Sequence, residues 1–494
     1  MKLSPVGHLR RSLVLVALSA AVSAPGLGAD EAGFVPLFDG TSLAGWKASE
    51  NQASFRVVDG AISCDGPRSH LFYVGADGRA AWEDFEAVAE VKARSGANSG
   101  FYFHTAFQEK DWPAQGFEVQ VNNSQKQHGD YFELKKTGSL YGIRNVYRAL
   151  APDDEWFTLK VSVRKPRVQV RVNDTLVVDW TEPAEPLPQD APKLNRLGRG
   201  TFALQCHDPE SQVAYRNLRV RALPKAAPDS TPPPVVDERY LRMLELGRAN
   251  FPLVDLHAHL KAGLSVEQAL SLSRATGMFL GLAVNCGKGF PIETDAGALA
   301  FVKSMETVPA FIGMQAEGRE WVSMFSKETR ARFDYVFTDS MTWTNPAGKR
   351  MRLWIPDEVE IGPDVQAFME LLVSKTVGIL ETEPIDVYVN PTFLPAAIAS
   401  QYDALWTEAR MTRVIDAAVK SRVAIEINAR YKLPSERFLR LAKAKGAKFT
   451  FGTNNAGPSD LGDWSYPLAM QKALDLKWQD MFVPGHQPSR AQRE

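Results

Sequence analysis

The chain has 494 residues, more than one ordinary domain holds, and its 45% hydrophobic and 23% charged residues are typical of a globular protein. The 57 basic and 58 acidic residues leave a formal net charge of -1, so the sequence offers no basic footprint for nucleic acid or for an anionic membrane. We therefore expect a small-molecule or sugar substrate and no nucleic-acid partner.

The first 29 residues are typical of a secretory signal peptide. A positively charged start precedes an apolar run over residues 12–24, which is too short to span a bilayer comfortably, and the small residues Gly28 and Ala29 follow. We predict cleavage after Ala29 and a secreted or periplasmic protein, with an uncleaved anchor as the alternative. No later apolar run approaches ~18 residues, so we expect no stable membrane insertion of the mature chain.

Residues 30–223 alternate between apolar and polar residues with period two, in short runs separated by turn residues. Such runs are found at residues 55–66, 85–93, 99–105, 116–123, 157–164, 168–180, 200–207 and 213–223. This spacing predicts an antiparallel all-β sandwich. Cys64 and Cys206 lie in this half and could pair in an oxidising compartment, whereas three buried free thiols, with Cys286, are the alternative.

Several segments of this half resemble a known family in their order along the chain. They include FVPLFDGTSLAGWK (34–47), ANSGFYF (97–103), FEVQV (117–121) and FALQCH (202–207). With these segments the first half resembles the 3-keto-α-glucoside 1,2-lyase/3-keto-2-hydroxy-glucal hydratase domain, formerly named the 3-keto-disaccharide hydrolase domain. The resemblance implies a concanavalin A-like sandwich that acts on 3-keto-glycosides.

Cleavage of a 3-keto-glycoside needs a base, an acid and groups that stabilise an enolate. A ketone at C3 acidifies the proton on C2, and once a base removes this proton the oxygen on C1 leaves by β-elimination. Water then adds to the resulting glucal. Glu118 and His207 are our candidates for proton transfer, with a structural carboxylate and a satisfied buried histidine as the alternative interpretations.

The candidate sugar contacts follow from positions on the predicted strands. Glu118 and Gln120 are two residues apart on one strand, and Gln205 and His207 are two apart on another, so each pair shares a face. The predicted substrate-binding residues are Asn98, His104, Gln120 and Gln205. The family often has Asp where this chain has Asn122.

The chain divides at a segment rich in Pro, Ala and charge, and we predict a stiff linker at residues 224–244 that permits either a docked or an independent arrangement. Residues 245–494 then alternate seven short apolar runs with helical stretches. This alternation predicts an α/β domain with a parallel sheet closed into a seven-stranded, TIM-like barrel.

Polar residues end the predicted strands of the second half, and in a barrel these ends converge on one rim, where active sites are built. His257 and His259 lie two apart on the first strand and face the same way, which suits two imidazoles that share a metal ion. Glu317 and Asp339 end later strands, so we predict one divalent metal on these four residues, with a polar rim without metal as the alternative. The other predicted rim residues are Asn390, Glu426, Asn428 and Asn454.

The second half also resembles a known family. DLHAH (255–259), AIEIN (424–428) and FGTNN (451–455) are similar to segments of the polymerase-and-histidinol-phosphatase family of metal-dependent hydrolases, whose fold is a distorted seven-stranded barrel. Asp339 and Asn390 stand where that family usually has His. These departures make a site with three metals implausible.

Three functions are compatible with the sequence. The first is an exported enzyme that cleaves 3-keto-glycosides in the sandwich by β-elimination and hydration, with the barrel as an accessory. The second is a sugar-binding sandwich that serves a metal-dependent hydrolase in the barrel, and the third is a protein in which neither site is catalytic. We favour the first, because the resemblance spans the entire first half in order.

Overall fold

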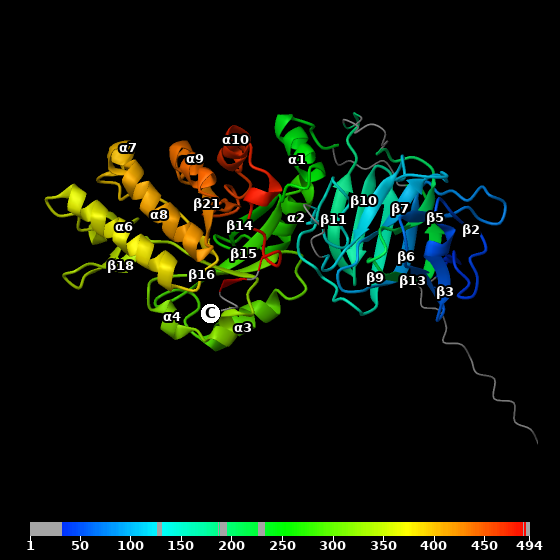
Figure 1. Cartoon of the computed structure of the whole chain (residues 1–494), viewed down its shortest axis with the longest axis horizontal. Coiled ribbons are helices and arrows are strands. Elements are labelled where there is room, and N and C mark those ends of the chain that lie inside the picture. The colour runs from blue at the N-terminus through cyan, green and yellow to red at the C-terminus, as the bar shows by residue number, and fades with distance from the viewer. Residues whose placement is uncertain are drawn as a thin grey trace, which may run out of the picture.

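The computed structural model describes residues 32–125, 131–185, 187, 195–225, 233–487 and 489–490, which form two halves side by side (Figure 1). The predicted signal peptide and residues 226–232 of the predicted linker lie outside the described residues. Within the described part of the chain, no helix is long and apolar enough to cross a membrane.

The first half consists of two antiparallel sheets, which confirms the predicted all-β sandwich. The eight-stranded sheet has the order β11-β10-β9-β6-β13-β4-β3, and β1 also pairs with β13. Its strands are β1 (Val35–Pro36), β3 (Phe55–Val58), β4 (Ala61–Cys64), β6 (Phe85–Ala93), β9 (Phe157–Arg164), β10 (Arg167–Val172), β11 (Thr175–Thr181) and β13 (Val213–Ala222). The five-stranded sheet has the order β2 (Trp46–Ala48), β5 (Ser69–Tyr73), β12 (Thr201–Cys206), β7 (Ser99–Thr105), β8 (Phe117–Val121).

The two sheets differ in how their outer faces are covered. Along β9, buried residues alternate with more exposed ones, as expected for a sheet with one face on the core and one in water. Strands β7 and β12 are instead buried along their whole length. The face of the five-stranded sheet that points away from the sandwich core is therefore also covered, and this face carries the candidate site.

The second half contains a closed barrel of seven parallel strands, as the sequence predicted in number and direction. In barrel order the strands are β14 (Val254–His259), β15 (Phe279–Cys286), β16 (Phe311–Ala316), β17 (Tyr335–Thr338), β20 (Val387–Tyr388), β21 (Ala424–Asn428) and β22 (Phe449–Gly452). The pairing of Asp255 with Phe451 closes the barrel between its first and last strands.

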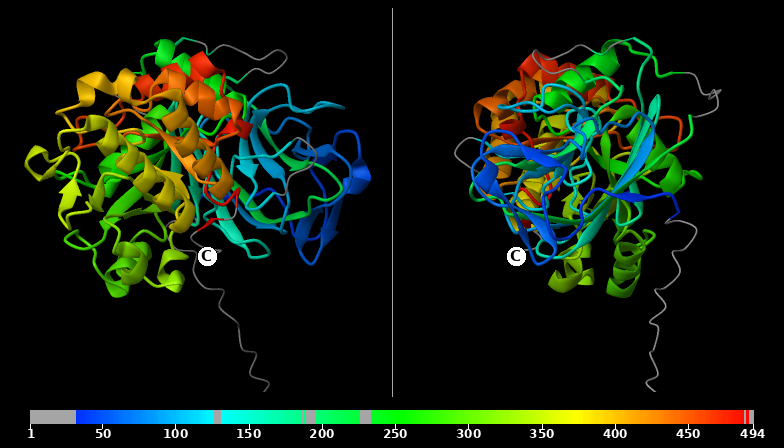
Figure 2. Two further views of the ribbon diagram at one scale, coloured as in Figure 1. Left: turned by 60° about the vertical axis from the view of Figure 1, so that its left-hand side comes forward. Right: turned by 90° about the vertical axis from the view of Figure 1, so that its right-hand side faces the viewer.

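Helices separate the barrel strands along the chain and lie outside them (Figure 2). They are α2 (Val266–Thr276), α3 (Asp295–Ser304), α4 (Trp321–Met324), α5 (Lys327–Arg330), α6 (Val365–Thr382), α7 (Tyr402–Leu405), α8 (Glu408–Ser421), α9 (Glu436–Ala444) and α10 (Ser465–Leu474). The long segment after β17 contains a small hairpin of β18 (Thr342–Thr344) and β19 (Arg350–Arg352).

The predicted linker ends earlier than expected, because helix α1 (Glu238–Arg248) begins within it. The side chain of Asp237 caps this helix by accepting a hydrogen bond from the backbone N–H of Tyr240, and the buried residues Met243 and Leu244 anchor it. Residues 238–244 are thus a packed helix rather than a solvated linker.

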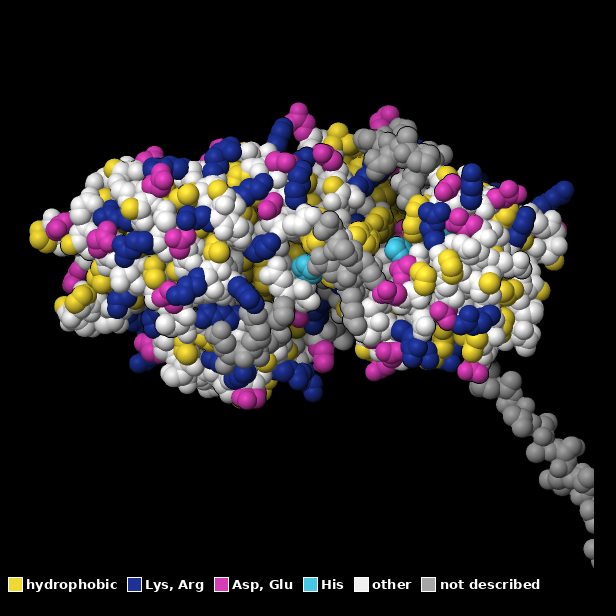
Figure 3. Space-filling view, viewed as in Figure 1, with side chains coloured by type: hydrophobic (Ala, Val, Ile, Leu, Met, Phe, Trp, Pro, Cys, Tyr) yellow, Lys and Arg dark blue, Asp and Glu magenta, His cyan; other side chains and the backbone are white. Residues whose placement is uncertain are grey.

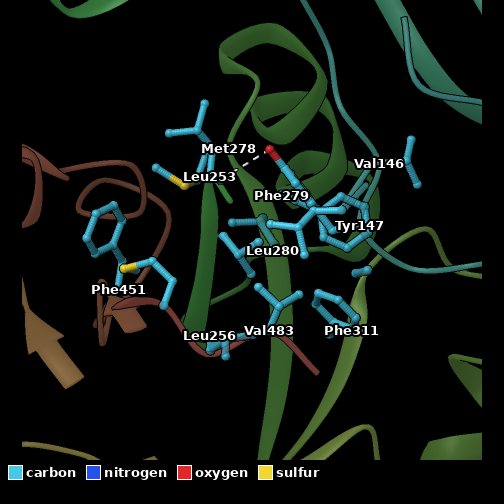
Figure 4. Packing of buried hydrophobic residues seen from close by; sticks show 14 of the residues in the cluster. Val146, Tyr147, Leu253, Leu256, Met278, Phe279, Leu280, Phe311, Phe451 and Val483 are labelled. Carbon is cyan, nitrogen blue, oxygen red and sulfur yellow. Dashed lines mark hydrogen bonds between the residues drawn. The ribbon is translucent and has the colours of Figure 1, made fainter. Parts of the chain in front are cut away.

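The two halves are docked through an apolar interface (Figure 4). Tyr147 from the sandwich lies among barrel residues that include Leu253 and Phe279, and the rings of Tyr147 and Phe279 are 5.9 Å apart. Polar contacts add to this packing: the Tyr147 hydroxyl donates to the carbonyl of Phe251 at 3.2 Å. The sequence left docked and independent arrangements open, and the structure has the docked one.

All three cysteines are buried free thiols in this structure. Burial raises the pKa of Cys64 well above its usual value, and it raises the pKa of Cys206 to about 11 and that of Cys286 to about 12. Of the two alternatives stated from the sequence, the structure has the unpaired one.

Candidate functional site

A cavity of about 280 Å³ lies on the outer face of the five-stranded sheet. Five of the six candidate residues of the first half line it: Asn98, Glu118, Gln120, Gln205 and His207. Four further residues that the sequence analysis did not select complete the lining: Trp112, Tyr131, Glu133 and Tyr141. Segments far apart in the sequence thus converge on one small polar cavity.

Glu118 lies on the floor of the cavity, on edge strand β8. Its carboxylate rests on Gly100 of strand β7, where an added Cβ would come within 2.4 Å of Glu118 Oε1. The side chain of Gln205 donates to the same oxygen at 3.3 Å, and the buried hydroxyl of Tyr102 also bonds to this carboxylate. Glycine at position 100 therefore provides the space that the carboxylate fills.

A chain of hydrogen bonds connects His207 to the amides of the cavity. His207 Nδ1 and Asp208 Oδ2 are 2.7 Å apart, and the hydroxyl of Ser211 donates to the same carboxylate at 2.9 Å. Ser211 Oγ in turn accepts from the backbone N–H of Asn98, whose Oδ1 accepts from Gln120 Nε2 at 2.9 Å. Burial raises the pKa of Asp208, but the hydrogen bonds that it accepts outweigh this and leave the pKa below its ordinary value.

Two amide oxygens of the cavity lack partners among the described residues. Gln120 Oε1 and Gln205 Oε1 are both buried and accept no hydrogen bond in the part of the chain that the structure describes. Because a buried acceptor without a donor costs free energy, these oxygens are suited to accept from a ligand that carries hydroxyl groups.

Tyr131, Glu133 and Tyr141 form one side of the cavity, which we call the Glu133 wall. Glu133 is fully buried, and its Oε2 accepts from both tyrosine hydroxyls at 2.8 Å. Its Oε1 accepts from the backbone N–H of Lys135 at 2.9 Å and from the Lys135 ammonium at 3.2 Å. The wall carboxylate is therefore surrounded by donors.

Asn122 attaches this wall to strand β8. Its side-chain amide donates to the carbonyls of Glu133 at 3.0 Å and of Lys135 at 2.9 Å, and its own oxygen accepts from the backbone N–H of Gln125 at 2.8 Å. An aspartate at this position could not make the two donations. Asn122, which stands where the resembled family often has Asp, therefore holds the wall in this protein.

His104 does not join the other candidates. Its Nε2 is 2.9 Å from the carbonyl oxygen of Glu83, and its Nδ1 accepts from the backbone N–H of Gly198 at 3.3 Å. Burial is the main cause that lowers its pKa to about 4. The predicted sugar contact of His104 does not fit this position, because the residue has a left-handed backbone conformation (φ 54°) at the end of β7 and does not line the cavity.

The barrel brings the predicted rim residues together at the carboxyl ends of its strands. His257 Nδ1 is 2.5 Å from Glu426 Oε1, and Glu426 Oε2 accepts from the backbone N–H of Asn390 and from Asn428 Nδ2. Asn390 Oδ1 accepts from Asn428 Nδ2 at 3.0 Å and from Asn454 Nδ2 at 2.9 Å. The rim is thus a connected polar network.

The four predicted metal ligands are buried but do not converge on one point. Among the described residues, no three or more His, Cys, Asp or Glu side chains form a group that could hold a metal ion. His257 Nδ1 is engaged by Glu426, while Glu317 bonds to Asn285 and Asp339 to Asn390. Burial and then the charge of Asp339 raise the pKa of Glu317. As placed, these residues do not fit the predicted metal.

The surface agrees with the balanced composition of the chain. Figure 3 shows basic and acidic side chains interspersed over the visible face of both halves. This face shows no extended patch of one sign over the described residues, which is consistent with the expectation of a small-molecule or sugar substrate.

Comparison with known proteins identifies the class of the first half. Residues 33–221 match the model of a family described as the 3-keto-alpha-glucoside-1,2-lyase-like domain. The first half is therefore similar to carbohydrate-active domains of the hydrolase and lyase type. The matched range ends before the barrel, and no curated protein matches the chain.

Solved structures of low identity cover the same half. A presumed glycosyl hydrolase from Parabacteroides distasonis is 21% identical with a TM-score of 0.34, over 39% of this chain and 94% of its own. The carbohydrate-binding module CBM66 from Bacillus subtilis is 13% identical with a TM-score of 0.26, over 36% of this chain and 96% of its own. A Bacillus subtilis protein of unknown function with a galectin-like fold is 11% identical with a TM-score of 0.29, over 39% and 96%.

Proposed function

We propose that the protein is an exported enzyme that cleaves 3-keto-glycosides by β-elimination followed by hydration, in the cavity of its first half. The observation that carries this proposal is the convergence of a carboxylate, an imidazole and three amides on one cavity of about 280 Å³. That volume lies near the low end of small-molecule sites, which suits one sugar ring with its aglycone directed outward. The family match of residues 33–221 supports the same substrate class.

Glu118 is the proposed base. It takes the proton from C2 of the keto-sugar, the electrons form the C1–C2 double bond through the enolate, and the bond between C1 and the glycosidic oxygen breaks. The carboxylate is only partly buried and rests against Gly100, so it can reach a sugar ring bound above the sheet. Hydration then adds the hydroxyl of water to C1 and its proton to C2, and the sum of the two steps is hydrolysis.

His207 is the proposed acid for the leaving oxygen. Its Nδ1 lies 2.7 Å from Asp208, and this contact leaves Nε2 for proton transfer. The carboxylate of Asp208 holds the orientation of the imidazole ring. Asn98, Gln120 and Gln205 hold the sugar, and the unpartnered buried oxygens of Gln120 and Gln205 are suited to accept from its hydroxyl groups.

A second candidate function belongs to the barrel, with the sandwich as a sugar-binding module. Its support is the buried imidazole of His257. Glu426 orients this ring through Nδ1, and Nε2 of His257 has no partner among the described residues. A divalent metal at His257, His259, Glu317 and Asp339 remains a prediction without support from their arrangement, so neither candidate function is routed through a metal. The resemblance of this half to metal-dependent hydrolases also remains a prediction.

The decisive experiment offers the full chain a 3-keto-glucoside and, as the matched control, the same glucoside with its C3 hydroxyl intact. The proposal expects aglycone release from the keto-sugar only, with deuterium incorporated at C2 when the reaction is run in D2O. Release from both sugars would favour ordinary hydrolysis, and no release with measurable binding would make the sandwich a binding module.

A further inference from the structure

The Glu133 wall presents hydrogen-bond acceptors to the cavity. A carboxylate has no proton to give, so the hydroxyls of Tyr131 and Tyr141 must both donate to Glu133 at 2.8 Å. Each hydroxyl has then spent its one proton, and its oxygen can only accept. The wall is thus matched to the donor hydroxyls of a sugar rather than to a ketone oxygen.

The position of this wall depends on one residue of the second half of the chain. Asn250 follows helix α1, and its Oδ1 accepts from the ammonium of Lys135 at 3.0 Å. Its Nδ2 donates to the carbonyl of Phe132 at 2.6 Å, and its Oδ1 also accepts weakly from the backbone N–H of Leu134 at 3.4 Å. One side chain therefore bonds on both sides of Glu133 along the chain.

Lys135 relays this contact to the cavity. Its ammonium is almost completely buried and bridges Asn250 Oδ1 and Glu133 Oε1, at 3.0 and 3.2 Å. It also lies 4.4 Å from the ring centre of Tyr141. A buried ammonium that loses a polar partner must move or draw in water, and either response shifts the carboxylate that holds the two tyrosines.

We propose that Asn250 is a positioning residue for sugar binding, through which the second half of the chain holds the Glu133 wall in place. The apolar interface around Tyr147 fixes the two halves to each other, and Asn250 transmits that fixed position to the wall. This inference rests on the proposed function for its sugar ligand, but the mechanical connection can be tested without any sugar.

The test uses the full chain with the substitution Asn250→Gly. The residue has a φ of 60°, in the left-handed region, so glycine removes the side chain without straining the backbone. Asn250→Asp keeps an acceptor for Lys135 but loses the donation to Phe132. Tyr147→Phe is the matched control, because it removes the bonds that the Tyr147 hydroxyl makes with Phe251 and Leu253 across the interface and leaves the side-chain contacts of Asn250 in place.

The first readout is amide hydrogen exchange over residues 131–141, which needs no substrate. We expect Asn250→Gly to speed this exchange at least tenfold, Asn250→Asp to have an intermediate effect, and Tyr147→Phe to leave it unchanged. Unchanged exchange in Asn250→Gly, or an equal change in Tyr147→Phe, would overturn the proposal. If the wild-type protein proves inactive on 3-keto-glucosides, the proposed function fails while this readout still decides the role of Asn250.

The second readout is the kinetics of 3-keto-glucoside cleavage. The wall binds sugar hydroxyls alike in the ground state and the transition state, so Asn250→Gly should raise KM about tenfold and change kcat less than threefold. Asn250→Asp should restore part of the loss in KM. A fall in kcat with KM unchanged would contradict positioning for binding, and so would a parallel loss of activity in Tyr147→Phe.

Discussion

The replacement Glu118→Gln tests the proposed base with little change of shape. The amide fills the same space above Gly100 and keeps a polar contact with Gln205, but it cannot take a proton from C2. The side chain is partly exposed at the cavity, so we expect the free energy of unfolding to change by less than about 1 kcal/mol. Any large loss of rate would then report on chemistry rather than on folding.

The size of that loss follows from the role assigned to Glu118. A positioned general base contributes roughly 10²- to 10⁴-fold to a rate, which corresponds to about 3 to 5 kcal/mol in the activation barrier. Gly100→Ala should cause part of the same loss although Glu118 is retained, because the new Cβ would lie 2.4 Å from the present position of Oε1 and would displace the carboxylate. This second variant tests the place of the carboxylate and the first tests its basicity.

The assay measures kcat and C2 deuterium exchange on a 3-keto-glucoside, with the melting temperature of each variant. Glu90→Gln is the matched control, because Glu90 is a carboxylate of the same sandwich that pairs with Arg216 outside the cavity. It should retain full activity. A Glu118→Gln enzyme within threefold of the wild type in both kcat and exchange would remove Glu118 from the mechanism.

Three further predictions concern the histidines. His207→Gln should slow release of an alkyl aglycone by roughly 10²-fold or more but hardly affect a nitrophenyl aglycone, which leaves without protonation; equal loss for both would contradict its role as the acid. The pKa of His104 falls from 6.5 unfolded to about 4 folded, mainly through burial, so the unfolded chain binds more protons between these values and stability is lost as pH falls through that window. The loss in the free energy of unfolding is at most about 3 kcal/mol. Urea unfolding curves recorded between pH 7 and pH 4 measure this loss. A His104→Asn variant whose stability depends on pH as steeply as that of the wild type would refute the prediction. Elemental analysis of the wild type and of the His257→Ala/His259→Ala variant tests the predicted metal: an equivalent lost in the variant would support the site, and no stoichiometric metal in the wild type would refute it.

The periodic part of the fold was accessible from the sequence. The alternation in segments such as FTLKVSVR predicted a strand with one buried face, and β9 shows that pattern over Phe157–Arg164. Strand–helix alternation likewise predicted seven parallel barrel strands. The same periodicity placed Glu118 with Gln120, and Gln205 with His207, because residues two apart in a strand share a face.

The remaining part of the site depends on contacts that no local pattern encodes. His104 ends its strand as His207 does, yet its left-handed φ and its bond to the Glu83 carbonyl keep it out of the cavity. The alternation of Tyr131 and Glu133 could have indicated a shared face. The sequence does not show which side of the sheet Tyr131 and Glu133 approach. Asn122 sets that side, because its side-chain amide, at the end of β8, donates hydrogen bonds to the carbonyls of Glu133 and Lys135.

The docking of the halves shows why the cavity cannot be attributed to the first half alone. Tyr147 of the first half and Phe279 of the barrel are only 2% and 4% exposed, and their rings lie 5.9 Å apart across the interface. Exposing side chains of this size costs roughly 1.5–3 kcal/mol each, a large part of the net stability of a domain. The segment that carries Tyr147 also carries Tyr141, so the interface with the barrel and the wall of the sugar cavity are two sides of one segment. The proline-rich connection therefore does not indicate that the two halves act independently. The apolar contact and Asn250 make the barrel part of the structure on which sugar binding depends.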